Sequence, residues 1–298
     1  MAVPAFAGDT RYGADDPAEK PYDTQDSRHR YGADQEGVGN GTAPSDWSSS
    51  FVAWWNMDET SGNRAQSGGT CGTDCNLLSA SAPGAGTYAK EGTGSAGFVS
   101  DNNENLDCAD VTCDELDFTA SDVTWGGWFR FTKAHEAGTE TFVFENTDAS
   151  QGYASRITTS DTWKCTVATG GTFSPASGST TLGDGRWRFL ACRYTNSGPI
   201  LEAMVDINTE ATSSPAGISG DAGQFEIGLE NGNRSIDGDV DMVFVANDIL
   251  TNAELCRIAA CGIDGSLCSC NGADYLDTGY FWRLGGNCTL PACNASAP

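Results

Sequence analysis

The sequence predicts an all-β protein built as a sandwich of two antiparallel sheets, on three observations. Short segments rich in β-branched and aromatic residues recur along the middle of the chain, and spacers such as TGG, GDG, NSG and NGN separate them. Glycine is abundant, at 37 of 298 residues, and eight tryptophans are many for so polar a chain. No run of about 18 apolar residues occurs, so we expect no membrane-spanning helix.

Residues 1–49 are expected to form an extended polar docking arm. They contain no Leu and no Ile, so they cannot bury enough apolar surface to offset their ordering entropy. The pentapeptide RYGAD occurs twice in this arm. We interpret Tyr12 and Tyr31 as docking residues that fill pockets on a partner, with Gly13 and Gly32 allowing close approach. Chance repetition in a low-complexity leader is the alternative.

Residues 50–262 carry the strand signals of the sandwich. The segment DVTWGGWFRF, at 122–131, alternates so that Val123, Trp125 and Phe129 share one face. The other strand candidates are 51–57, 141–146, 153–159, 163–169, 186–195, 200–207, 224–231 and 239–247. Regular short strands separated by turns are typical of a sandwich.

One helix is predicted, over LTNAELCRIAA at 250–260. Thr251 is its expected N-cap, Glu254 completes a capping box, and Gly262 follows as a stop. Residues 263–298 are dense in cysteine and poor in aliphatic side chains, so they predict a small disulfide-rich tail without a core of its own.

The cysteines indicate a disulfide framework formed in an oxidising environment. There are twelve: Cys71, Cys75, Cys108, Cys113, Cys165, Cys192, Cys256, Cys261, Cys268, Cys270, Cys288 and Cys293. Zinc is the competing interpretation, but Cys71-x-x-x-Cys75 has no second pair in its own segment, so disulfides are favoured. Cys165 and Cys192 lie on neighbouring strand candidates, and we expect them to pair across the sandwich.

The charge of the chain excludes some partners and permits others. With 16 basic and 41 acidic residues the formal net charge is −25, which disfavours nucleic acids and anionic membranes. No cofactor is required, but so acidic a chain is compatible with bound Ca²⁺. The candidate ligands are Asp58, Asp237 and Asp239, and a hydrated turn is the alternative at each.

Four segments together resemble the LamG-like jelly roll of the concanavalin A-like lectin/glucanase superfamily. They are VAWWNMDETSGN, DVTWGGWFRF, GDGRWRFLACRYTNSGPILEAMVDI and FEIGLENGNRSIDGDVDMVFVANDILTNAEL, in the order of the family. The resemblance covers about 51–260 and implies a two-sheet jelly roll. Members bind glycans or proteins, hydrolyse polysaccharides or serve as architecture, so the likeness leaves function open.

The sequence predicts no catalytic residues. Glucanases of the superfamily carry Glu-x-Asp-x-x-Glu or Glu-x-Asp-x-Glu on one strand, because two carboxylates must flank the scissile bond. The nearest match is DGDVDMVF, where Asp239 and Asp241 share a face but the third carboxylate is missing. The only histidines, His29 and His135, lie in polar segments.

Glycan binding requires exposed aromatic faces beside short polar groups. Trp163 and Tyr153 are the candidate platforms, and burial in the sandwich core is the alternative for both.

These observations predict a non-enzymatic structural or attachment protein of a virus particle, such as a bacteriophage capsid decoration or head or tail appendage. The arm would bind other virion proteins or copies of the chain, and the jelly roll would be displayed outward and bind host glycans. The opening MAVPAFAGDTRYGADD lacks the features of a secretion signal, whereas cell lysis brings virions into oxidising surroundings. The alternative is a secreted or cell-surface bacterial lectin-like protein.

Overall fold

A computed structural model describes residues 50–263, with gaps at 79–80, 82, 91, 109–112, 134–138, 148–149, 221–222 and 229–235. The chain divides into two compact units, Met1–Gly39 and Asn40–Pro298, and every described residue belongs to the second. The predicted arm and nearly all of the predicted cysteine-rich tail lie outside the described residues. The domain boundaries inferred from the sequence therefore stay predictions.

The described residues form an all-β fold with one short α-helix, as the sequence predicts. The strands are β1 (Phe51–Trp55), β2 (Gly84–Ala85), β3 (Ala96–Phe98), β4 (Leu106–Cys108), β5 (Val123–Lys133), β6 (Thr141–Thr147), β7 (Gly152–Ile157), β8 (Thr162–Thr169), β9 (Thr172–Thr181), β10 (Trp187–Thr195), β11 (Ile200–Val205), β12 (Asn208–Ser213), β13 (Phe225–Ile227) and β14 (Asp237–Ala246). The helix is α2 (Asn252–Cys261), and the 3-10 turns are η2 (Gly72–Cys75), η3 (Ser100–Asn102) and η5 (Asp114–Leu116).

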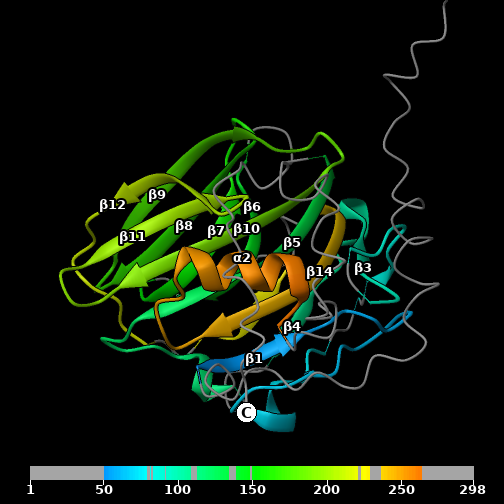
Figure 1. The fold of residues 1–298 in the computed structure, drawn as a ribbon, viewed down its shortest axis with the longest axis horizontal. Coiled ribbons are helices and arrows are strands. Elements are labelled where there is room, and N and C mark those ends of the chain that lie inside the picture. The colour runs from blue at the N-terminus through cyan, green and yellow to red at the C-terminus, as the bar shows by residue number, and fades with distance from the viewer. Residues whose placement is uncertain are drawn as a thin grey trace, which may run out of the picture. The chain divides into compact units, whose positions relative to one another are not determined.

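The strands form two antiparallel sheets. One sheet has eight strands in the order β12-β11-β10-β5-β14-β3-β2, with β1 also paired to β14. The other has six strands in the order β4-β13-β6-β7-β8-β9. Figure 1 shows α2 lying across strands of the eight-stranded sheet. The two-sheet sandwich confirms the predicted fold class.

Sequence reasoning missed β9, whose sequence TFSPASGSTT contains Pro175. A proline cannot donate to a sheet ladder, so it argues against a central strand. However, β9 lies at the edge of the six-stranded sheet, where one side of the strand has no neighbour in the sheet. The edge position accommodates the proline, and only the topology reveals it.

Aromatic rings fill the core between the sheets. Trp125 and Phe129 come from β5, and Phe144, Tyr153 and Trp163 come from the six-stranded sheet, all of them buried. The centroids of the Trp125 and Tyr153 rings lie 4.9 Å apart, and those of Phe129 and Phe144 lie 5.4 Å apart. Burial of one large apolar side chain contributes about 1.5–3 kcal/mol, so this cluster is a main source of stability.

A second apolar cluster lies between α2 and the outward face of the eight-stranded sheet. A bulge in β14 between Asp241 and Phe244 allows Val243 to stay in the core while Phe244 faces the helix. Gly127 on β5 leaves room for this bulge, because a Cβ there would lie 2.9 Å from the carbonyl oxygen of Met242. The Gly-Gly pair of WGGW thus lies next to the bulge, where the inward and outward alternation of side chains along β14 is interrupted.

The helix begins and ends as the sequence predicts. The amide of Glu254 donates to the Thr251 hydroxyl at 3.2 Å, and the Thr251 amide donates to the Glu254 carboxylate at 2.6 Å. Gly262 follows with a φ of 71°, a conformation that favours glycine. In the described part of the chain, no helix combines the length and apolar character needed to cross a membrane.

A disulfide joins the two sheets. Cys165 on β8 and Cys192 on β10 are bonded with their Cα atoms 5.7 Å apart, which confirms the expected pair. The other two described pairs are local: Cys71–Cys75 and Cys108–Cys113. Cys256 is also disulfide-bonded. The side chains of the remaining predicted framework cysteines lie outside the described set: Cys261, Cys268, Cys270, Cys288 and Cys293.

Replacing Cys165 and Cys192 together by alanine should lower the free energy of unfolding by about 3–4 kcal/mol, because their bond restricts a long loop of the unfolded chain. The matched control replaces Cys108 and Cys113, whose sequence separation is 5 rather than 27, and should cost about 2 kcal/mol. Equilibrium urea denaturation measures both losses. Equal losses would show that the disulfide between the sheets adds no more to the free energy of unfolding than the local disulfide does.

Candidate functional site

The two aromatic residues predicted as sugar platforms lie in the core. Trp163 and Tyr153 are both buried between the sheets, and the Trp163 indole N–H donates to the carbonyl of Ala191 at 3.2 Å. A sugar stacks only on an exposed ring face. The assignment of these two residues to glycan binding is therefore wrong, and the alternative of core residues is right.

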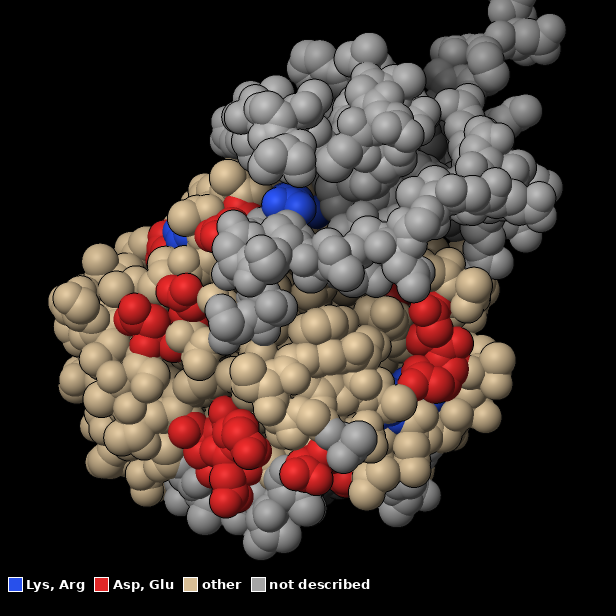
Figure 2. All heavy atoms as spheres, turned by 60° about the horizontal axis from the view of Figure 1, so that its bottom comes forward, with Lys and Arg blue, Asp and Glu red and all other residues tan. Residues whose placement is uncertain are grey.

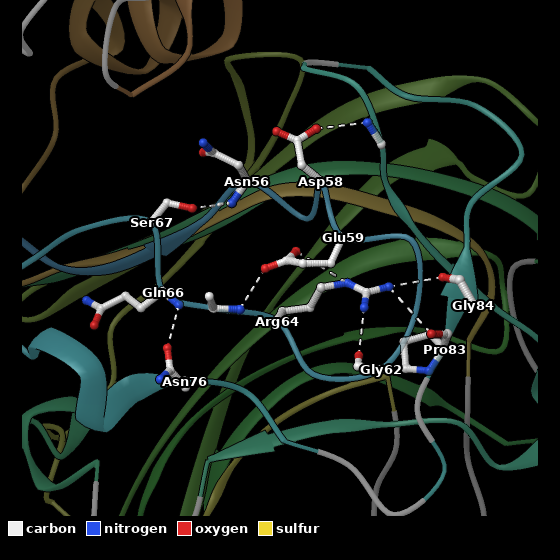
Figure 3. A network of polar contacts seen from close by, with 12 residues as sticks. Asn56, Asp58, Glu59, Gly62, Arg64, Gln66, Ser67, Asn76, Pro83 and Gly84 are labelled. Atoms are coloured by element: carbon white, nitrogen blue, oxygen red, sulfur yellow. Dashed lines mark hydrogen bonds and ion pairs between the residues drawn. The ribbon is translucent and has the colours of Figure 1, made fainter.

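Asp58, a predicted calcium ligand, anchors a loop (Figure 3). Its Oδ1 accepts hydrogen bonds from the amides of Thr93 at 2.6 Å and Gly94 at 2.8 Å. Amide hydrogens carry positive partial charge, so the same oxygen is poorly placed to bind a cation.

The loop that contains Asp58 is built around a buried cation. The Arg64 guanidinium is fully buried and donates to the carbonyls of Gly62 at 2.6 Å and Gly84 at 3.0 Å (Figure 3). Burial lowers the pKa of Arg64, and the nearby Glu59 carboxylate opposes that shift. These contacts fasten the segment after β1 to β2, so this polar network serves the fold.

The other two predicted calcium ligands lie on β14. Asp239 forms an ion pair with Arg130 at 2.9 Å, and Asp237 accepts a hydrogen bond from the Thr132 hydroxyl at 3.0 Å. Burial raises the pKa of Asp239, while the Thr87 amide and Arg130 oppose that shift. Within the described residues, the only cluster of three potential metal-binding side chains consists of cysteines. The predicted aspartates are therefore not brought together as a calcium site.

The pair Asp239 and Asp241, the nearest match to the glucanase motif, shares one face as predicted but is covered. The segment between β2 and β3 crosses both residues, and its Thr87 and Lys90 amides donate to Asp239 at 2.9 Å and Asp241 at 2.7 Å. Lys90 also lies 4.3 Å from the centroid of the Trp128 ring. Both carboxylates are buried, and the hydrogen bonds that they accept hold this segment on the sheet.

A row of three carboxylates crosses the outward face of the six-stranded sheet. Glu226 on β13 lies directly opposite both Asp107 on β4 and Glu145 on β6. The strand neighbours Leu106, Cys108, Phe144, Phe225 and Ile227 all lie in the core. Side chains alternate along a strand, so the three carboxylates point away from the core. We name Asp107, Glu226 and Glu145 the acidic row, which spans about 10 Å at the usual strand spacing.

Each carboxylate of the acidic row accepts a hydrogen bond from the residue two positions away on its own chain. The donors are Asn105 to Asp107 at 3.2 Å, Thr147 to Glu145 at 2.7 Å, and Gln224 to Glu226. Glu145 is 7% exposed and Glu226 is 8% exposed, while Asp107 is more open. The row is thus oriented by same-face neighbours, with its two glutamates buried and Asp107 the more accessible end.

A second row on this face combines an aromatic ring with cations. Phe142 lies opposite Arg156, which lies opposite Lys164. The Arg156 guanidinium lies 3.7 Å from the centroid of the Phe142 ring, and Lys164 forms an ion pair with Glu140 at 2.7 Å. At the edge, the ring of Phe173 on β9 is 40% exposed. The face therefore has acidic and cationic groups in adjacent rows, with one exposed aromatic ring at its edge.

The acidic row places carboxylates directly opposite one another. Like charges directly opposite each other in an antiparallel pair destabilise it, by about 0.2–1 kcal/mol per pair. Burial raises the pKa of Asp107, and the hydrogen bond from Asn105 opposes that shift. Locally unfavourable arrangements in a stable fold are candidates for functional positions.

Sequence reasoning missed the acidic row because its members lie on three separate strands. Each is a single acid between two buried residues, in LDC, FEN and FEI. That local signal places one carboxylate on an outward face, but it does not say which strands are neighbours. The residues predicted for docking, Tyr12, Gly13, Tyr31 and Gly32, lie outside the described residues, as do His29 and His135.

The fold and its outward sheet faces define a lectin-like β-sandwich. The sequence model of the concanavalin A-like lectin/glucanases superfamily matches residues 103–256, more than half of the chain. The chain belongs to this superfamily. None of the curated proteins compared with the chain matches it.

Solved structures resemble the fold at low sequence identity. The binding domain of botulinum neurotoxin DC, in complex with SialylT, is 11% identical with a TM-score of 0.53 and covers 75% of this chain. The same domain in complex with rat synaptotagmin II is 10% identical, covers 74% of this chain and also has a TM-score of 0.53. This chain covers about half, 52%, of each. Domain 4 of an arabinanase from Geobacillus stearothermophilus, in complex with arabinotriose, is 13% identical over 71% of this chain and 99% of its own, with a TM-score of 0.49. At these identities the likenesses show the fold alone.

Asp107→Asn should raise the free energy of unfolding at neutral pH by about 0.5 kcal/mol, because it removes a charge opposite Glu226. The raised pKa of Asp107 means that the folded state binds its proton more tightly than the unfolded state. Its contribution to stability therefore falls as pH rises from about 3.9 through the raised pKa, and the variant should lose that slope. Urea denaturation across this pH range measures both effects.

The matched control is Glu210→Gln, because Glu210 accepts amide hydrogen bonds from Ser179 at 2.8 Å and Thr180 at 2.9 Å. This variant should be less stable than the parent. A loss of stability in Asp107→Asn as well would contradict the view that the acidic row is a cost to the fold.

Proposed function

We propose that this chain is a non-enzymatic carbohydrate-binding protein that uses the outward face of the six-stranded sheet. The observation that carries the proposal is the acidic row, in which Asp107, Glu226 and Glu145 lie in register across three adjacent strands. Carboxylate oxygens accept hydrogen bonds from sugar hydroxyls, and a few fixed polar groups on a firm surface set ligand orientation.

The surroundings of the acidic row support a sugar ligand. Phe173, which is 40% exposed at the edge of this face, offers apolar surface for sugar C–H groups. Phe142 is buried, and the Arg156 guanidinium contacts its ring. The firm scaffold of paired strands limits the ordering entropy lost on binding. The neurotoxin domain of similar fold is described in complex with SialylT, which is compatible with this use of the fold.

The proposal treats the carboxylates as binding groups. The superfamily's catalytic acids share one strand, whereas the acidic row comes from three strands, and the same-strand pair Asp239 and Asp241 is covered. A retaining glycosidase would need two carboxyl groups about 5–5.5 Å apart, one of them protonated. Glu145 and Glu226 are the pair to test for that activity.

Glu226→Gln should weaken glycan binding at least tenfold, since each charge-assisted hydrogen bond contributes about 1.5–3 kcal/mol. A glycan array selects the ligand, and isothermal titration calorimetry measures its Kd. Asp184→Asn, with the same loss of charge on a turn outside this face, should bind as the parent does. Equal binding by the parent and Glu226→Gln would remove the acidic row from the site.

The same glycans should be recovered uncleaved after incubation with the parent. Release of reducing ends by the parent and not by Glu226→Gln would identify a hydrolase and contradict the non-enzymatic assignment.

As the setting of this binding we propose a virus particle, with the jelly roll displayed at the virion surface and residues 1–49 docked to other virion proteins or to copies of the chain. The support is in the sequence: a polar arm with a repeated Tyr-Gly element, many cysteines and a net charge of −25. On the face shown in Figure 2, acidic side chains form several separate groups and basic ones are few, which disfavours an anionic partner. A secreted or cell-surface lectin is the alternative setting, and both are extracellular.

Deletion of residues 1–49 should leave the sandwich folded and abolish incorporation into the assembly, because the arm supplies the docking contacts. Near-ultraviolet circular dichroism reports the fold, and co-sedimentation with particles reports incorporation. A second variant keeps the full chain but replaces Tyr12 and Tyr31 by alanine. It should also reduce incorporation, because these two side chains are the proposed docking contacts. A truncated chain that still joins the particle would refute docking by the arm.

A further inference from the structure

Two disulfides from different parts of the chain lie against each other. The Sγ atoms of Cys71, Cys75 and Cys113 all lie within 4.8 Å of one another. The Sγ atoms of Cys108 and Cys113 lie 3.2 Å and 3.5 Å from the carbonyl oxygen of Asp74, the residue just before Cys75. The four sulfur atoms therefore lie close together, next to Asp74.

We propose that Cys71, Cys75, Cys108 and Cys113 bind one zinc ion when both disulfides are reduced. This inference is independent of glycan binding. Structural zinc sites hold four thiolates at about 2.3 Å from the metal, which places the sulfur atoms about 3.8 Å apart in a tetrahedron. The Sγ atom of Cys113 already lies within 4.8 Å of those of Cys71 and Cys75, at most about 1 Å beyond this spacing. The sulfur atoms within each disulfide separate when the bond is reduced.

The fold supplies the second cysteine pair that the sequence around Cys71 lacks. Zinc ligands commonly come as C-x₂₋₄-C pairs, and three residues separate Cys71 from Cys75 while four separate Cys108 from Cys113. A 3-10 turn, η2, leads to Cys75, and another, η5, follows Cys113. Tight turns beside paired cysteines allow two thiolates of one segment to approach one ion.

Contacts that do not involve sulfur hold three of the four residues in place. The Cys71 amide donates to the carbonyl of Val52 at 3.0 Å, and the Trp55 indole N–H donates to the carbonyl of Cys75 at 2.8 Å. Cys108 is paired with Phe225 in the sheet. These contacts do not require the disulfides, so the reduced chain keeps the sulfur atoms close together.

The environment suits thiolate ligands. All four cysteines are buried, so water does not compete for the metal. The Glu115 carboxylate lies 3.7 Å from the Cys71 Sγ, where it can accept the proton that the thiol loses. Each disulfide closes only its own short loop, whereas one zinc ion would tie both loops to each other.

A dithiol reductant supplies the electrons and protons that convert the two disulfides into the four thiols that bind zinc. Two dithiol molecules each give two electrons and two protons to one protein disulfide and become disulfides themselves. The four protein thiols then release four protons as they bind one Zn²⁺. Oxidising surroundings favour the two disulfides, and reducing surroundings with zinc favour the metal site.

The test uses the full chain reduced with a water-soluble phosphine, alkylated with iodoacetamide with and without one equivalent of Zn²⁺, and mapped by mass spectrometry. Zinc should slow alkylation of Cys71, Cys75, Cys108 and Cys113 at least tenfold, because a metal-bound thiolate is a poor nucleophile. Cys165 and Cys192 serve as the internal control and should react at the same rate with and without zinc. Equal alkylation rates with and without zinc at the four cysteines would overturn the proposal. This holds even if the cause is that reduction unfolds the chain.

Cobalt provides a second readout, since tetrahedral Co²⁺–thiolate sites absorb visible light. The reduced parent and the Cys192→Ser control should both show this absorption, and Cys113→Ser should lose most of it. Undiminished absorption in Cys113→Ser would place the metal elsewhere and contradict the assignment.

Discussion

The rest of the structure depends on the covalent and hydrogen-bonded link between β8 of one sheet and β10 of the other, which we call the joint. Cys165 and Cys192 link β8 to β10 covalently, and Trp163 donates its indole N–H across the same joint to Ala191. At the edge, Glu210 on β12 accepts hydrogen bonds from the Ser179 and Thr180 amides on β9. The core between the sheets is apolar, and its contacts have little directionality. The joint fixes how β8 and β10 face each other, and alternation along each strand then places every second side chain outward.

The two outward faces have different roles. On the eight-stranded sheet, α2 covers an apolar cluster, and the segment between β2 and β3 is held down by Asp239 and Asp241. Those carboxylates accept backbone hydrogen bonds, so they stabilise the fold. On the six-stranded sheet, Glu226 instead lies directly opposite two other acids, one on each neighbouring strand. This contrast leads us to place ligand binding on the six-stranded sheet.

The zinc proposal and the disulfide framework describe the same four sulfur atoms under different redox conditions. The local disulfides restrict little of the unfolded chain, because the loops they close are short. Cys71 is bound to β1 through the carbonyl of Val52, and Cys108 belongs to β4, so backbone hydrogen bonds that do not involve sulfur also position these disulfides. A chain made in a reducing compartment and used in an oxidising one would pass through both forms.

The sequence by itself determined the elements of this protein. Strand alternation, turn residues and the capping box of Thr251 are local properties, so they predicted the sandwich, most of its longer strands and the helix. Tertiary structure decided the site, because neighbours in a sheet are set by topology and not by distance along the chain. It buried Trp163 and Tyr153 in the core and brought Asp107, Glu145 and Glu226 into one row. Local pattern tells which side of a strand a residue occupies, while only the packed sheets tell what lies beside it.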